Sequence, residues 1–124
     1  MKINHETERI KINGNLYPCG ASITMAFIGG KWKMVILYHL KSGEKRYNEL
    51  RKEMPTITER TLSLQLKQLE NDGLIARKVF TKKPPMKVIY SLTELGQSLI
   101  PLLDSIASWG NKIAEEQGKL VSIK

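Results

Sequence analysis

A leucine stripe bounded by a proline and a glycine is the feature that most constrains how this chain can fold. Leu62, Leu66 and Leu69 recur at intervals of four and three residues, so they lie on one face of a helix. Pro55 ends whatever helix comes before it, and Gly73 provides the left-handed stop expected at the end of such a helix. The sequence therefore predicts an amphipathic helix whose leucine face is buried and whose opposite face points outward.

A shorter helix is predicted just before it. Residues 47–54 can form two helical turns, which Pro55 ends. Thr56 or Thr58 then offers an N-cap side chain for the longer helix, which extends to about Asn71. Two helices joined by a turn of this length are typical of a helix-turn-helix, although ordinary helical hairpins have the same spacing.

The next segment predicts a β-hairpin with a basic tip. Residues 74–80 and 87–92 have strand character, with Val88 and Tyr90 on one face, and a proline-containing basic loop at 81–86 joins them. Helix, turn, helix and hairpin occur in this order in a winged helix-turn-helix. We therefore expect a mainly α fold with a small β-hairpin (α+β), of the winged helix-turn-helix kind.

The N-terminal third is less regular. Residues 1–18 show no sustained apolar period, and 13–15 (NGN) is a turn sequence, so we expect a mobile arm. A short helix over 21–27 is predicted to break at Gly29-Gly30, and a second helix is predicted over 31–41. The expected apolar stripe of that second helix consists of Trp32, Val35, Ile36 and His39/Leu40. Because Trp32 shares this stripe, a core role is favoured for it over base stacking.

Positive charge is concentrated in the middle of the chain. The net charge is +8, and residues 41–90 hold twelve Lys and Arg against six Asp and Glu. Residues 91–124 hold three basic against four acidic side chains, so the C-terminal third is nearly neutral. A surface that binds nucleic acid or another polyanion is therefore expected in the central fifty residues.

The outward side of the leucine-striped helix is the predicted DNA-reading surface, because the N-terminal part of the second helix meets base edges in a helix-turn-helix. Leu64 there either contacts a thymine methyl group or is an ordinary exposed leucine. Thr58 either caps the helix or donates to a phosphate. The residues expected to read bases are Arg60, Thr61, Ser63 and Leu64, with Lys67 nearer the phosphates.

Further DNA contacts are expected outside this helix. Arg46 and Asn48 lie at the start of the short helix, after a stretch at 44–46 that is extended or loop-like. Lysines of the hairpin tip are placed to meet phosphates beside the groove-bound helix, although a solvated loop would have the same composition. These lysines are Lys82, Lys83 and Lys87.

The C-terminal third predicts a helix with a heptad-like apolar stripe. Thr93 is a candidate N-cap, and Pro101 is expected to bend or interrupt the helix. The length and near-neutrality of the helix favour a dimer interface; the alternative, supported by Leu103, which widens the face, is that the stripe packs on the domain's own core. We expect a domain over 19–113 and a tail over 114–124. The predicted interface residues are Leu95, Leu99, Leu102, Ile106, Trp109 and Ile113.

Five segments in register resemble the motifs of the HxlR family of bacterial winged helix-turn-helix regulators, and the match covers about Cys19 to Ile113. The resemblance implies a homodimeric cytoplasmic regulator that binds a near-palindromic double-stranded DNA operator, with terminal helices forming the dimer interface and no cofactor. The matching segments are Ile28-Gly29-Gly30-Lys31-Trp32, Arg46-Tyr47-Asn48-Glu49-Leu50, 66–75 (LKQLENDGLI), 90–96 (YSLTELG) and Trp109-Gly110.

Cys19 is the only cysteine, so it cannot form a disulfide within the chain. Family members commonly carry a cysteine at the start of the first helix, and several use it to sense electrophiles or oxidants; here it stands between Pro18 and Gly20, where the family usually has Cys-Pro. A helix N-terminus favours thiolate, and Lys31 and Lys33 would add to this. The alternative is a small, partly buried thiol without a sensing role.

Sequence-specific DNA binding by a regulator is the leading hypothesis, with a thiol switch at Cys19 as a further step. The alternatives are a winged-helix adaptor that binds proteins and a regulator that responds to a non-covalent small ligand. No catalytic constellation is visible, one cysteine with His5 and His39 does not make a metal site, and no apolar stretch exceeds five residues, so we expect a soluble cytoplasmic protein that is not an enzyme.

Overall fold

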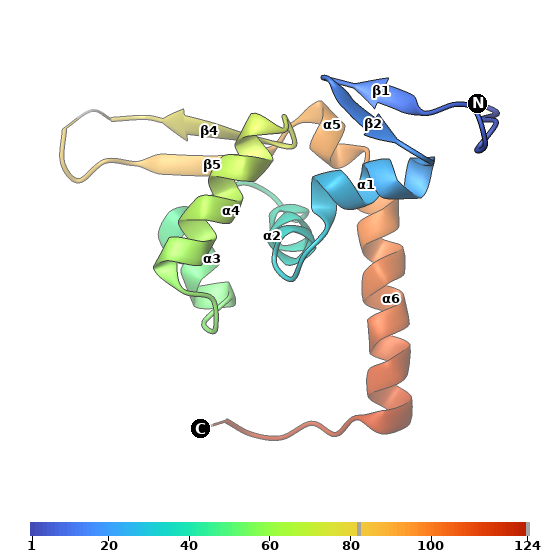
Figure 1. Cartoon of the computed structure of the whole chain (residues 1–124). Coiled ribbons are helices and arrows are strands. Elements are labelled where there is room, and N and C mark those ends of the chain that lie inside the picture. The colour runs from blue at the N-terminus through green and yellow to red at the C-terminus, as the bar shows by residue number, and fades with distance from the viewer. Residues whose placement is uncertain (82, 124) are drawn as a thin grey trace.

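The computed structural model describes residues 1–81 and 83–123, and Figure 1 shows how their helices and strands are arranged. A winged helix-turn-helix body is flanked by an N-terminal hairpin and by a long C-terminal helix. The elements along the chain are β1 (Ile10–Ile12), β2 (Asn15–Tyr17), α1 (Gly20–Ile28), α2 (Lys33–Leu40), β3 (Lys45–Arg46), α3 (Tyr47–Glu53), α4 (Glu59–Asn71), β4 (Ile75–Val79), β5 (Val88–Leu92), α5 (Glu94–Gln97) and α6 (Ile100–Gln117).

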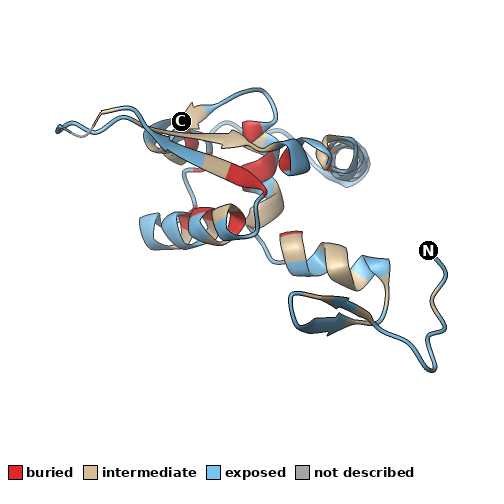
Figure 2. Cartoon of the chain, turned by 90° about the horizontal axis from the view of Figure 1, so that it is seen from above, coloured by how far each residue is buried: buried red, intermediate tan, exposed pale blue. Residues whose placement is uncertain are grey.

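The core lies where the helices of the body face the sheet, as the buried residues in Figure 2 show. The leucine stripe of α4 is confirmed, because Leu62, Leu66 and Leu69 are each at most 1% exposed. Both predicted helix ends are also confirmed. The Thr58 hydroxyl accepts a hydrogen bond from the Thr61 N–H at 3.1 Å, and Gly73 has a φ of +78°.

The sheet has three antiparallel strands in the order β3-β5-β4. Ile75 pairs with Leu92 and Val79 with Val88, which puts Val88 on the same face as Tyr90, as predicted. The stretch expected to be extended or loop-like becomes the short strand β3, which pairs with β5. The hairpin of β4 and β5 extends beyond the helices in Figure 1 and forms the wing.

The apolar stripe predicted for α2 is wrong in part. Ile36 and Leu40 are buried as expected, but Leu37 is also fully buried and Val35 is 37% exposed. The physical reason is that α2 packs against α3, α4, α6 and the sheet, so its buried residues cover a wide arc. A single stripe describes a helix with one packed face, and α2 has several.

The segment expected to be an irregular arm contains a β-hairpin. Strands β1 and β2 pair in an antiparallel register from Ile10↔Tyr17 to Ile12↔Asn15. The predicted turn sequence does form the turn, with Asn13 and Gly14 both at positive φ. Strands of only three residues are too short to show a sustained periodic pattern, so the sequence revealed the turn and not the strands.

The C-terminal helix is interrupted earlier and ends later than predicted. The break comes at Ser98-Leu99, between α5 and α6, and Pro101 lies in the first turn of α6, where its missing N–H costs nothing. Helix α6 continues to Gln117, beyond the boundary expected at Ile113. None of the described helices, α6 included, is both long enough and apolar enough to span a membrane.

Two leucines of α4, two positions apart, test this packing. We expect Leu66→Ala to lower the free energy of unfolding by about 2–5 kcal/mol, because it leaves a cavity in the core. Leu64→Ala removes the same atoms from a side chain that is 51% exposed, so its effect should stay below about 0.5 kcal/mol. Urea unfolding of both variants measures the difference, and equal losses would contradict the orientation of α4.

Candidate nucleic-acid interface

The outward face of α4 brings together most of the residues predicted to read bases. Arg60, Ser63, Leu64 and Lys67 are all exposed on the side opposite the leucine stripe. Thr61 differs from them, because it is half-buried and its hydroxyl accepts a 2.8 Å hydrogen bond from the Thr58 hydroxyl. Thr58 thus acts as the helix cap, and the cap engages Thr61 as well.

The N-terminus of α3 lies against the same face. The Tyr47 hydroxyl donates to the Glu59 carbonyl at 3.3 Å and lies 3.4 Å from the Ser63 hydroxyl. Tyr47 also packs on the core, so it holds the first turns of α3 and α4 together. Sequence patterns did not reveal this residue, since its partners are 12 and 16 positions away in the chain.

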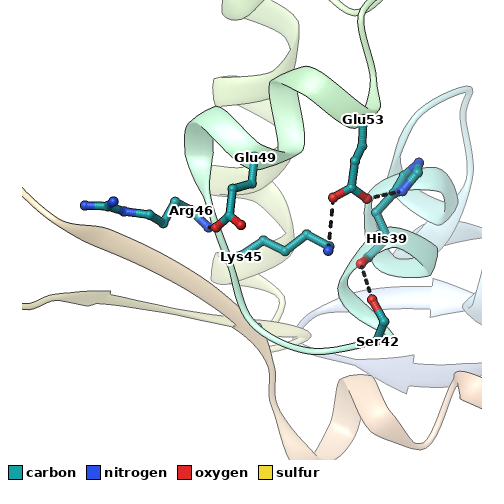
Figure 3. A network of polar contacts seen from close by, with 6 residues as sticks. All are labelled: His39, Ser42, Lys45, Arg46, Glu49 and Glu53. Atoms are coloured by element: carbon teal, nitrogen blue, oxygen red, sulfur yellow. Dashed lines mark hydrogen bonds and ion pairs between the residues drawn. The ribbon is translucent and has the colours of Figure 1, made fainter.

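Arg46 and Asn48 are exposed at the start of α3, as predicted. The Arg46 N–H donates to the Glu49 carboxylate at 2.8 Å, so the backbone of this turn is fixed while the guanidinium extends outward in Figure 3. A fixed backbone with a free cationic side chain is suited to a phosphate contact.

A polar network behind this turn positions α3, as Figure 3 shows. One oxygen of Glu53 lies 2.8 Å from His39 Nδ1 and the other lies 3.0 Å from Lys45 Nζ. The hydrogen bond from Lys45 has the largest effect and lowers the pKa of the Glu53 carboxyl; burial opposes it, and the hydrogen bond from His39 lowers the pKa further. The network joins the ends of α2 and α3 to β3.

The wing carries more exposed basic residues than the sequence pattern indicated. Lys83 and Lys87 are exposed, while Lys82 lies outside the described residues. The strand register puts Arg77 on the face that Ile75 turns to the core, and Lys78 on the opposite face. Lys87 extends the ladder opposite Phe80, with its Nζ 5.6 Å from the ring centroid. Both faces of the wing therefore present cations.

Cys19 is the N-cap of α1 and is half-buried. Its sulfur lies 3.8 Å from the Ser22 hydroxyl. Hydrogen bonding by the Ser22 backbone, and after it by the Ser22 side chain, lowers the pKa of the Cys19 thiol against the effect of burial. The groups responsible are thus at the helix N-terminus, as predicted, whereas Lys31 and Lys33 do not contribute.

An apolar face runs along α5 and α6. Leu103 makes the inward contact with the core, so the stripe itself is left largely uncovered. Leu99 packs against the core and Ile113 is half-buried. Beside α6, Val35 and Tyr38 of α2 are also exposed. The exposed members of the predicted stripe are Leu95 (52%), Leu102 (38%), Ile106 (38%) and Trp109 (68%).

Comparison with known proteins decides the family. Residues 27–118 match the family model of the HxlR-like helix-turn-helix, which is most of the chain. The chain belongs to the HxlR family. This confirms the resemblance of the sequence motifs, and it agrees with the winged helix-turn-helix fold found above.

HxlR relatives resemble the chain in both sequence and structure. It is 50% identical over 102 residues to the HTH-type transcriptional regulator YdeP of Bacillus subtilis, and the alignment covers 82% of this chain and 79% of YdeP. The redox regulator HypR in its oxidised form superposes with a TM-score of 0.71 at 46% identity, covering 76% of this chain and 96% of HypR. Reduced YodB of B. subtilis superposes with a TM-score of 0.65 at 30% identity, over 79% and 96% of the two chains.

The Glu53 network generates a pH prediction. Folding lowers the pKa of Glu53. The ionised Glu53 carboxylate therefore stabilises the folded protein at pH values above its pKa in the unfolded chain, and this stabilisation is lost as the pH falls through its pKa in the folded protein. Glu53→Gln should therefore cost at most about 1 kcal/mol at pH 7, since exposed ion pairs are screened by water. Urea unfolding at pH 7 and about pH 3.5 should show the difference from wild type shrink in acid.

Glu116→Gln is the matched control, because Glu116 is exposed near the end of α6. If the free energy of unfolding differs between Glu53→Gln and the wild type by the same amount at both pH values, the role given to the carboxylate is contradicted.

Proposed function

We propose that this chain is a transcriptional regulator that binds double-stranded DNA sequence-specifically, as a homodimer on a near-palindromic operator, in the cytoplasm where the chromosome lies. One observation carries the proposal: α4 buries its leucine stripe and presents Arg60, Ser63, Leu64 and Lys67 outward, beside a basic wing. An α-helix with this division fits the major groove. The regulators YdeP and HypR, which this chain resembles, support the same function.

The contacts divide into two kinds. Arg60 can bind guanine through both ends of its guanidinium, and Leu64 can contact a thymine methyl group. Thr61 is the weaker candidate, because its hydroxyl is engaged by the cap. Backbone contacts position the protein without reading sequence. They are assigned to Arg46, Asn48, Lys67, Lys82, Lys83 and Lys87, and the structure adds Arg77 and Lys78 as candidates.

The dimer is proposed through the apolar face of α5 and α6. Four of its large apolar side chains are between 38% and 68% exposed in the single chain, and burial against a second copy would remove them from water. A two-fold dimer that reads two half-sites needs its α4 helices about 34 Å apart, or a multiple of that.

A thiol switch is proposed at Cys19. The helix N-terminus stabilises the thiolate form, and thiolate is the reactive form of cysteine. HypR, with which the chain superposes in both oxidised and reduced forms, is a redox regulator. Since the chain holds one cysteine, Cys19 would form an adduct with an electrophile, or an oxidant would join it to a small thiol or to Cys19 of the partner subunit.

Two substitutions separate base reading from backbone binding. Arg60→Ala should cost about 1–3 kcal/mol on a duplex enriched from a random pool by the wild type, and much less on random duplex. Lys83→Ala should weaken binding to both duplexes alike, and it should lower the slope of log affinity against log salt concentration by about 1. Gel-shift titrations at two salt concentrations measure both effects.

If Arg60→Ala loses the same binding affinity for the two duplexes, α4 is not the helix that reads bases. Failure to enrich any duplex would instead favour the adaptor function, whose protein contacts should depend little on salt between about 50 and 200 mM.

The dimer is tested on α6. Ile106→Asp places a charge in the proposed interface, so the dissociation constant should rise at least about tenfold. Asn111→Asp adds the same charge to an exposed position off the stripe and should leave the dimer intact. Sedimentation equilibrium reads the mass relative to the 14.1 kDa monomer. A wild type that stays monomeric at micromolar concentration would contradict the proposal.

The switch is tested by oxidation. Diamide with glutathione should change the affinity of the wild type for the enriched duplex by about fivefold or more, and dithiothreitol should restore it. Cys19→Ser should bind like the reduced wild type and ignore diamide. If both proteins respond equally, or neither does, Cys19 is not the switch.

A further inference from the structure

A cleft lies between the N-terminal hairpin and the end of the DNA-reading helix. Its volume is about 210 Å³, and no residue assigned above to DNA binding lines it. Figure 1 shows the four elements that meet there: the β1–β2 hairpin, α1, the C-terminus of α4 and α5. The lining residues are Ile12, Asn13, Asn15, Tyr17, Ala26, Phe27, Asn71, Asp72 and Leu95.

The register of the hairpin explains which side chains enter the cleft. Ile12 pairs with Asn15, and Tyr17 lies two positions beyond Asn15, so all three share one face of the hairpin. Lys11 pairs with Leu16 on the opposite face. The hairpin therefore turns its aromatic and amide side chains toward the cleft and its lysine away from it.

The charge of the cleft is opposite to that of the protein. Asp72 contributes a carboxylate, and no basic side chain is among the lining residues, although the chain carries a net charge of +8. Within the described part of the chain, no hydrogen bond or ion pair engages the side chains of Asp72, Asn71, Asn13 or Asn15. Their oxygens are available to a ligand that donates hydrogen bonds.

Tyr17 and Phe27 give the cleft two half-buried aromatic rings. An ammonium group is attracted both by a carboxylate and by the face of an aromatic ring, while an apolar group would cover Ile12. We propose that this cleft binds a small organic ammonium compound with an aromatic or apolar group. The volume is below the ~300 Å³ at which drug-sized sites begin, so the ligand is small.

The position of the cleft gives the ligand a route to DNA binding, and this part of the inference rests on the proposed function. Asn71 is the last residue of α4, and Asp72 caps it, its N–H donating to the Gln68 carbonyl at 2.9 Å. A ligand held between Asp72 and the hairpin would contact the end of α4 directly. It would therefore bias the position of the helix that carries Arg60.

The test uses phenethylamine as the probe and the full-length protein without DNA. Amide chemical shifts of cleft residues should move in a saturable titration, while 3-phenylpropionate, with the same ring and opposite charge, should leave them unchanged. Asp72→Asn should weaken phenethylamine binding about tenfold, through loss of one charge-assisted contact. Glu115→Gln removes an exposed carboxylate from α6, far along the chain from the cleft, and should bind like the wild type.

A second variant keeps the test independent of any folding defect in Asp72→Asn. Asn15→Asp adds a carboxylate to the exposed rim of the cleft and should tighten phenethylamine binding about threefold. Absence of binding to the wild type, or equal affinities of the wild type, Asp72→Asn and Asn15→Asp, would overturn the site.

The link to DNA is measured separately. Phenethylamine should change the affinity of the wild type for its enriched duplex at least about threefold, and the concentration needed for half of this change should be about tenfold higher in Asp72→Asn. Binding of the probe with no change in duplex affinity would overturn the link. Failure of the proposed function is distinguishable, because it would appear as an absence of duplex preference before any probe is added.

Discussion

The burial of the leucine face of α4 is the interaction on which the rest of the structure depends. Leu62, Leu66 and Leu69 fill the core, so the opposite side of the helix has to face outward. The same packing fixes the first residues after the helix, because the Leu74 N–H donates to the Leu69 carbonyl at 3.0 Å and Leu74 enters the core. The outward face of α4 and the start of the wing are thus positioned by one apolar contact surface.

Polar contacts lock the chain segments that meet at the end of α4. The Thr93 hydroxyl donates to the Gly73 carbonyl at 2.6 Å, and the Thr93 N–H donates to the Leu74 carbonyl at 3.1 Å. A side chain at Gly96 would place its Cβ 2.1 Å from that same carbonyl oxygen, so only glycine allows the approach. These contacts therefore join the end of α4 and the start of the wing to α5.

On the other side of the body, polar contacts add to the apolar packing between α2, β3 and α3. Glu53 holds His39 and Lys45, and Tyr47 holds the first turn of α3 against α4. These exposed contacts contribute little free energy compared with the leucine core, but they fix angles that apolar packing leaves free. The core therefore determines that α4 faces outward, and the polar contacts determine how α3 and Arg46 sit beside it.

Local patterns determined α4, its caps, the wing strands and the outward position of Arg60, Ser63, Leu64 and Lys67, because periodicity, capping and turn residues act within a few positions of one another. The sequence motifs likewise determined the family. Only the tertiary structure decided that Leu37 is buried, that residues 10–17 form a hairpin, that Glu53 joins His39 to Lys45 and that Asp72 meets Tyr17 across a cleft. Three of these join residues that are far apart in the chain or depend on how many neighbours surround a helix, and the strands of the hairpin are too short to leave a periodic pattern, so no spacing in the sequence encodes them.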